Sequence, residues 1–157
     1  MADEQLKQLL ADGVQSMHSG ALISEGATQE VSDDATHSDL KRLLEEGSEQ
    51  SKEWKARIEH AVSETSGGED QGNPIVQAHV EVARRIRAQA PDDRSRDLGI
   101  IASGQLALHY WIAAFGTAGA YADQLGMDET AQAFGACVRE AKEADEKHSE
   151  LAQAMLH

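Results

Sequence analysis

The chain has 157 residues and a formal net charge of −14, from 28 acidic and 14 basic side chains. Such an acidic surface repels phosphate backbones and anionic lipid headgroups. We therefore expect neither nucleic acid nor a membrane among its partners. The length fits a single domain, 1–157, and a composition that is 40% hydrophobic but only 4% aromatic favours closely packed helices. The N-terminus lacks a signal-like pattern, no apolar run of about 18 residues is found, and the single Cys137 cannot form an intramolecular disulfide. We therefore expect a cytoplasmic protein.

Apolar residues recur at three- and four-residue steps along most of the chain, and both prolines fall between the periodic stretches. This spacing predicts helices over about 3–23, 38–65, 75–89, 94–125 and 128–156. The polar stretch SEGATQEVSDDATHS, from Ser24, predicts a connection between the first two helices. Because no strand pattern is found, the predicted fold is all-α, an antiparallel four-helix bundle with one additional short helix.

Two stretches of these helices stand out. In the second helix, Gly47, Gln50 and Ser51 stand where the apolar stripe should be strongest, and such residues let a helix approach or line a space. The short third helix ends in a basic cluster, which we expect to pair with neighbouring carboxylates or with a partner subunit. The cluster consists of Arg84, Arg85 and Arg87.

The last third of the chain contains several short motifs. They are HY (109–110), GT (116–117), ADQLG (122–126), AD (144–145) and LA (151–152). In these motifs the chain resembles the YciE/YciF family of bacterial ferritin-like proteins, while the first half resembles that family only diffusely, through LLADG. The resemblance implies a ferritin-like bundle, a homodimer, a link to stress responses and a di-iron site.

The positions that the resemblance assigns to iron ligands have mostly lost their carboxylates. The family's Glu-His-Tyr-Glu is LHYW (108–111) here, its Glu-Glu-Thr-His is EQSK (49–52), and its run of three Glu is REA (139–141). A Glu of the first helix is replaced by Met17, whereas Asp145 is retained. A di-iron centre requires several hard anionic oxygen ligands, so we predict a degenerate site that holds no cofactor.

Two replacements for such a centre are open. In the first, which we favour, bulky side chains fill the old cavity. In the second, the cavity remains as a pocket for a small apolar ligand. The residues at this position are Met17, Gln50, Ser51, Leu108, Trp111 and Ala141.

A metalloprotein is the alternative to a bundle without metal. His148 follows Asp145 by about one helical turn, and the two could bind iron or another transition metal together with Glu49 and His109. Cofactor binding through other histidines, such as His18, His60 and His79, is a further alternative. Since no nucleophile motif or phosphate loop is found, the sequence favours a non-enzymatic protein that acts as a dimeric or ligand-binding module.

Overall fold

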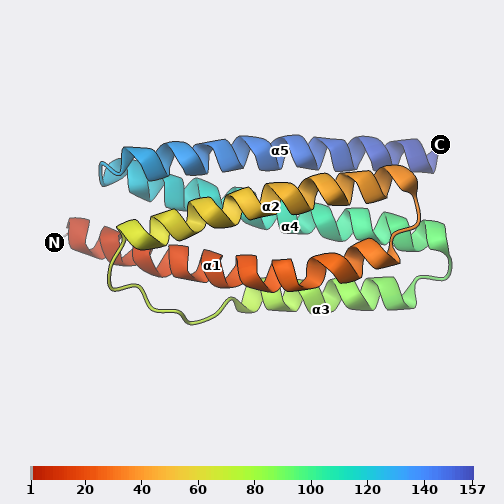
Figure 1. Cartoon of the computed structure of the whole chain (residues 1–157), viewed down its shortest axis with the longest axis horizontal. Helices are drawn as coiled ribbons and strands as arrows, with labels where there is room; N and C mark the ends of the chain where they lie inside the picture. The colour runs from red at the N-terminus through yellow and green to blue at the C-terminus, as the bar shows by residue number, and fades with distance from the viewer. Residues whose placement is uncertain (1) are drawn as a thin grey trace.

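The computed structural model describes residues 2–157 as five α-helices, with no strand among these residues. The helices are α1 (Ala2–Asp34), α2 (Ser38–Glu64), α3 (Pro74–Gln89), α4 (Asp93–Gln124) and α5 (Asp128–Leu156). α1 and α2 form one antiparallel hairpin, α4 and α5 form a second, and the chain crosses between the two through α3 (Figure 1). The prediction of an all-α bundle of four long helices with one additional short helix is confirmed.

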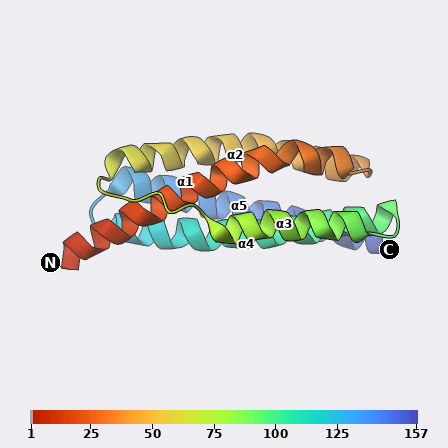
Figure 2. The same cartoon turned by 90° about the horizontal axis from the view of Figure 1, so that it is seen from below.

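Each long helix packs against two antiparallel neighbours. α1 contacts α2 and α4, and α5 also contacts α2 and α4, which is the arrangement of a four-helix bundle with one long crossover. α3 lies outside this square and runs along both α1 and α4 (Figures 1 and 2). The interior between the long helices is therefore closed by α3 on the side where α1 meets α4.

The buried residues form two hydrophobic clusters. The larger cluster is centred on four aromatic side chains, Trp54, Trp111, Phe115 and Phe134, and it draws residues from α1, α2, α4 and α5. The smaller cluster, near the α1–α2 turn, contains Ala35, Leu40, Ile100 and Ile101. Since the two clusters do not share a residue, the bundle is not packed uniformly along its length.

Helix α1 extends to Asp34, so the predicted connection that starts at Ser24 is wrong for most of its length. The stretch contains no proline, and Val31 packs against the smaller cluster, which rewards a continued helix. The chain turns only at residues 35–37. There the buried carboxylate of Asp97 accepts hydrogen bonds from the backbone N–H of Thr36 at 2.9 Å and from its hydroxyl at 2.6 Å.

Ion pairs fasten α3 to the end of α1. Arg87, whose side chain is 6% exposed, binds Glu30 at 2.6 Å and Asp34 at 2.8 Å, and Arg84 also binds Glu30. The expectation that the basic cluster pairs with neighbouring carboxylates is thus confirmed for two of its three arginines. The third, Arg85, is exposed.

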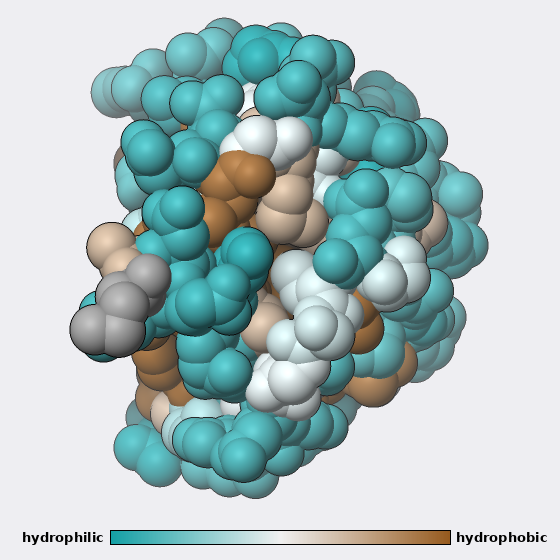
Figure 3. Space-filling model, turned by 90° about the vertical axis from the view of Figure 1, so that its left-hand side faces the viewer, coloured by the Kyte–Doolittle hydropathy of each residue, from teal (hydrophilic) through white to brown (hydrophobic). Residues whose placement is uncertain are grey.

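Helix α4 has an unusually apolar composition. By length and composition alone, it is the one helix of residues 2–157 that could cross a membrane, which corrects the expectation that no such run exists. Only 28% of the residues in its most apolar 18-residue stretch are buried within the chain, and Leu106 of this helix is 63% exposed. By contrast, polar side chains dominate the end of the bundle that Figure 3 shows, with apolar groups between them. α4 therefore presents an uncharged face that the rest of the chain does not cover.

Candidate ligand-binding pocket

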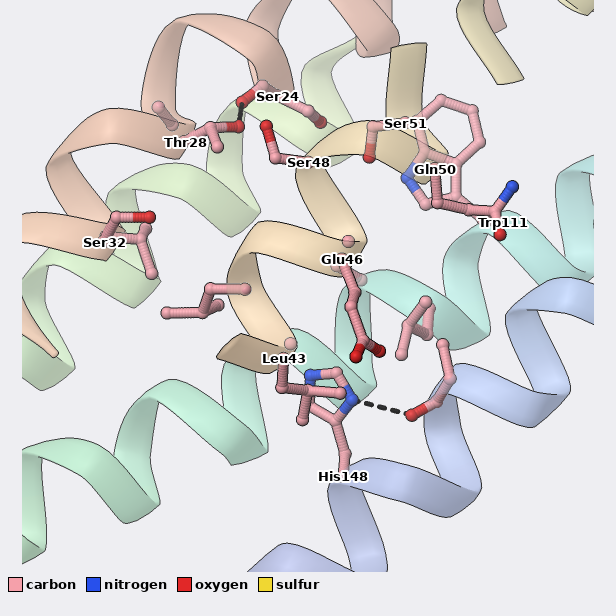
Figure 4. Close-up of a pocket in the computed structure, with 18 of the residues that line it drawn as sticks. Ser24, Thr28, Ser32, Leu43, Glu46, Ser48, Gln50, Ser51, Trp111 and His148 are labelled. Atoms are coloured by element: carbon pink, nitrogen blue, oxygen red, sulfur yellow. Dashed lines mark hydrogen bonds between the residues drawn. The ribbon is translucent and has the colours of Figure 1, made fainter. Parts of the chain in front are cut away.

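A cavity of about 280 Å³ lies inside the bundle, between the second half of α1, the first half of α2 and the middle of α4 and α5. Residues of α3 close one side of it. It is partly open to solvent, and Figure 4 shows the side chains that surround it. The cavity adjoins the larger hydrophobic cluster, and the two share Trp54 and Trp111.

Aromatic and aliphatic side chains form one wall of the cavity. The Trp54 and Trp111 rings lie 6.5 Å apart between centroids, and Phe115 packs within 5.5 Å of both. Leu108 lines the cavity one turn before Trp111 on α4, and Leu44 lines it from α2. Such a wall takes up apolar rings by burial and by aromatic stacking.

Hydroxyl groups of α1 and α2 form a rim of the cavity. Ser24, Thr28 and Ser32 are spaced by four residues along α1, so they share one face, and Ser48 and Ser51 of α2 lie opposite them (Figure 4). The Thr28 hydroxyl donates to the Ser24 carbonyl oxygen at 3.0 Å. The rim therefore offers small polar groups without adding a charge.

A histidine of α5 reaches the cavity from the side opposite this rim (Figure 4). The Nδ1 atom of His148 lies 2.7 Å from the carbonyl oxygen of Ala144. Burial lowers the pKa of His148 below its ordinary value of 6.5, although the Ala144 carbonyl and the nearby Asp145 act in the opposite direction. The ring is therefore neutral at pH 7.

The Glu140 carboxylate of α5 is bound by three side chains of α2. It accepts hydrogen bonds from Trp54 Nε1 at 2.8 Å, from Arg57 Nη1 at 2.7 Å and from Gln50 Nε2 at 3.1 Å. Burial raises the pKa of Glu140, but the Arg57 and Trp54 hydrogen bonds outweigh this effect, and the pKa lies below 4.5. The same guanidinium donates to the sulfur of Cys137, a buried thiol whose pKa is raised by burial.

The predicted pocket residues divide into two groups. Gln50, Ser51, Leu108 and Trp111 line the cavity. Met17 and Ala141 do not line it, because they are packed in the larger cluster with at most 3% of their surface exposed. The residues expected to fill the old site thus pack in or against the larger cluster, and a cavity remains beside them.

Two parts of the site were missed by sequence reasoning. The α1 hydroxyls Ser24, Thr28 and Ser32 were assigned to a connection, although their four-residue spacing is itself a helical signal. His148 was considered only as a metal ligand, and its neighbour on α4, Gly104, was not considered.

The four predicted metal ligands do not form one cluster. His109 Nε2 lies 3.1 Å from Asp145 Oδ2, on a histidine side chain that is 64% exposed. Glu49 is an exposed residue that pairs with Lys52 at 2.9 Å, and His148 is bound to a backbone carbonyl. Within residues 2–157, the one group of three His and Glu side chains with converging ligand atoms is exposed. It consists of His60, Glu64 and Glu129.

An all-α bundle with two antiparallel hairpins, one crossover and a central cavity between facing helices defines the ferritin-like class. The chain belongs to the family described as Domain of unknown function (DUF892), whose family model matches residues 5–157. The resemblance to the YciF type is thus confirmed at the level of family and fold.

Two solved structures share this fold. The Escherichia coli stress protein YciF has a TM-score of 0.89 at 21% identity, with 96% of each chain covered. YcfI from Rhodopseudomonas palustris has a TM-score of 0.84 at 23% identity, with 92% of each chain covered. No curated protein matches the sequence. At these identities the two structures establish the fold alone.

Proposed function

We propose that this protein is a non-enzymatic, stress-associated member of the ferritin-like class, in which a small-ligand pocket takes the place of a di-iron centre. The observation that carries the proposal is the chemistry of the interior. Met17, Trp111 and Ala141 are buried where the resemblance assigns carboxylates, and none of them supplies an oxygen ligand. The description of the Escherichia coli structure as a stress protein supports the link to stress.

Glu140, in the run of positions that the resemblance assigns to ligands, supports the same proposal. Glu140 is already bound by the guanidinium of Arg57 and by the indole N–H of Trp54. A guanidinium therefore neutralises this carboxylate where a metal ion would otherwise do so. The residues present do not fit a di-iron centre.

Iron loading tests the absence of a di-iron centre. Purified protein is incubated with ferrous iron in air, desalted and analysed for metal, and we expect no stoichiometric iron. The His60→Ala variant controls for iron held by the exposed His60, Glu64 and Glu129 group. About two irons per chain in both proteins, the load of a di-iron centre, would contradict the proposal.

A mononuclear metal site is the alternative that one observation favours, namely the 3.1 Å approach of His109 to Asp145. It has less support, because Glu49 is paired with Lys52 and the four candidate ligands do not converge on one point among the described residues. About one metal ion per chain, lost in a His109→Ala variant, would favour this alternative. Cofactor binding through histidines would instead give the purified protein a visible absorption band.

We also propose that two copies of the chain associate through α4. No charged side chain occurs in residues 99–122, and Leu106 is largely exposed on this helix. Elsewhere two copies that each carry a net charge of −14 repel one another, whereas this face lets them approach. A homodimer in the cytoplasm is the arrangement we expect.

A further inference from the structure

We propose that the cavity binds a neutral, ring-containing apolar compound that carries one hydroxyl or N–H group, and that this group donates a hydrogen bond to Nε2 of His148. The inference rests on the proposed function, because it names the ligand class of the pocket proposed there. It follows from the tautomer of His148, from the accessible surface of its Nε2 atom, and from the charges and size of the cavity.

The hydrogen bond at Nδ1 fixes the tautomer of His148. A carbonyl oxygen can only accept, so the 2.7 Å contact with Ala144 places the ring hydrogen on Nδ1. In the neutral ring, Nε2 then carries a lone pair and acts as an acceptor. This atom makes no hydrogen bond within the described chain, 2–157, so its acceptor capacity is available to a ligand.

The lack of a side chain at Gly104 lets α4 pack directly against the His148 ring. A Cβ atom at Gly104 would lie 2.8 Å from His148 Nε2, which is too close for the present arrangement. Gly104 and His148 both line the cavity, one from α4 and one from α5. Among the described residues no fully buried side-chain nitrogen or oxygen lacks a partner, so Nε2, which has none, keeps accessible surface that a donor group in the cavity can reach.

The charges around the cavity exclude an anionic ligand. Only two lining residues are cationic, and both are already paired within residues 2–157. Lys147 binds Glu46 at 3.1 Å, and Arg87 binds Glu30 and Asp34. Three carboxylates also line the cavity: Glu46 is paired with Lys147, Glu140 is paired with Arg57, and Glu143 is exposed. Because burial of an unpaired charge against an apolar wall is costly, the cavity favours a ligand without charge.

The size of the cavity and its wall indicate a compact ring system. A cavity of about 150 Å³ is known to hold benzene, so 280 Å³ has room for a fused two-ring compound. Trp54 and Trp111 supply a flat aromatic surface for such a ring. The donor group then distinguishes this ligand from a plain hydrocarbon.

Three naphthalene probes separate the features of this ligand. 1-Naphthol carries a hydroxyl donor, 1-methoxynaphthalene has the same ring without a donor, and 1-naphthoate carries a charge. Binding is followed by tryptophan fluorescence, because two tryptophans line the cavity. We expect 1-naphthol to bind roughly five- to tenfold more tightly than 1-methoxynaphthalene, as one hydrogen bond contributes, and 1-naphthoate to bind most weakly.

Two variants test the role of His148 independently. His148→Phe keeps a ring but removes the acceptor, and Gly104→Ala places a methyl group against Nε2. In both, we expect the preference for 1-naphthol over the methoxy compound to disappear while both probes still bind. His109→Ala changes a histidine outside the cavity lining and should leave the preference intact. If His148→Phe does not fold, Gly104→Ala carries the test, since overpacking by one methyl group typically costs less than the total stability of a typical domain.

The outcomes separate this inference from the proposed function. If no probe binds the unmodified protein, the proposed pocket itself is wrong. If all three probes bind equally, if 1-naphthoate binds best, or if the preference survives Gly104→Ala in a folded protein, the pocket stands but the ligand class is wrong.

Discussion

Glu140 remains charged in the interior because α2 surrounds it with donors. Gln50, Trp54 and Arg57 follow one another at spacings of about one helical turn, so their side chains meet the same carboxylate. Their hydrogen bonds hold the pKa of Glu140 below 4.5 against the effect of burial, which raises it. The guanidinium of Arg57 and the two neutral donors, Gln50 and Trp54, are therefore enough to stabilise a carboxylate in this bundle.

Removal of the positive charge of Arg57 should destabilise the fold. We expect Arg57→Met to lower the free energy of unfolding at pH 7 by about 1–3 kcal/mol, because it leaves Glu140 charged, three-quarters buried and short of a partner. Urea unfolding measures the change. The matched control is Arg42→Met, which removes an exposed pair with Asp39 at 3.4 Å and should have little effect.

The loss in Arg57→Met should also depend on pH. A carboxylate whose pKa is lowered in the folded state contributes stability above its unfolded pKa, and this contribution is lost as the pH falls through the folded pKa. The folded pKa of Glu140 lies below 4.5, so the difference between the two proteins should shrink as the pH falls below about 4.5. An equal difference at pH 7 and under acidic conditions would contradict the assigned partner.

At the scale of the helix, α1 shows why composition was misleading. Ser24, Thr28 and Ser32 have modest helix propensity, and clusters of such residues usually indicate loops. Here they are polar because they line a cavity, and Val31 between them packs against the smaller cluster. The polar stretch therefore indicated a binding surface on a helix, which propensity alone cannot distinguish from a loop.

Two glycines of α1 allow a test of how this helix is packed. A Cβ at Gly13 would meet no atom within 4 Å, whereas a Cβ at Gly20 would lie 2.7 Å from Asn73 Nδ2 and 3.1 Å from Val76 Cγ2. Asn73 caps α3, since its side chain accepts from the Val76 N–H at 3.0 Å, and it is itself 3% exposed. Gly20 thus lies in close contact with the start of α3.

Alanine at these two positions should have opposite effects. We expect Gly13→Ala to raise the free energy of unfolding by about 0.5–1 kcal/mol, because alanine loses less backbone entropy in a helix. Gly20→Ala should instead lower it by about 1–3 kcal/mol through overpacking against Asn73 and Val76. Thermal or urea unfolding of both variants measures the difference. Equal stabilisation by the two alanines would show that α3 does not pack on α1 in this way.

For the molecule as a whole, periodicity predicted the bundle but not its interior. The three- and four-residue spacing located all five helices, because each long helix must bury one stripe. Four of the residues proposed for the pocket, Gln50, Ser51, Leu108 and Trp111, line the cavity. Whether the inward faces meet or leave a cavity depends on distances between helices, which follow from side-chain packing across the whole bundle and not from any single stripe.

The uncharged face of α4 leads to a prediction about assembly. Only about a quarter of the residues in its most apolar 18-residue stretch are buried within one chain, and Leu106 is exposed on this helix.

We expect the protein to be a dimer at micromolar concentrations. Leu106→Glu should give a monomer, because each copy would bury a carboxylate against the other. Native mass spectrometry and light scattering report the mass. Leu9→Glu on α1, where the leucine is 57% exposed, is the matched control and should remain a dimer. A Leu106→Glu protein that stays dimeric would move the interface away from α4, and a monomeric unmodified protein would exclude the dimer altogether.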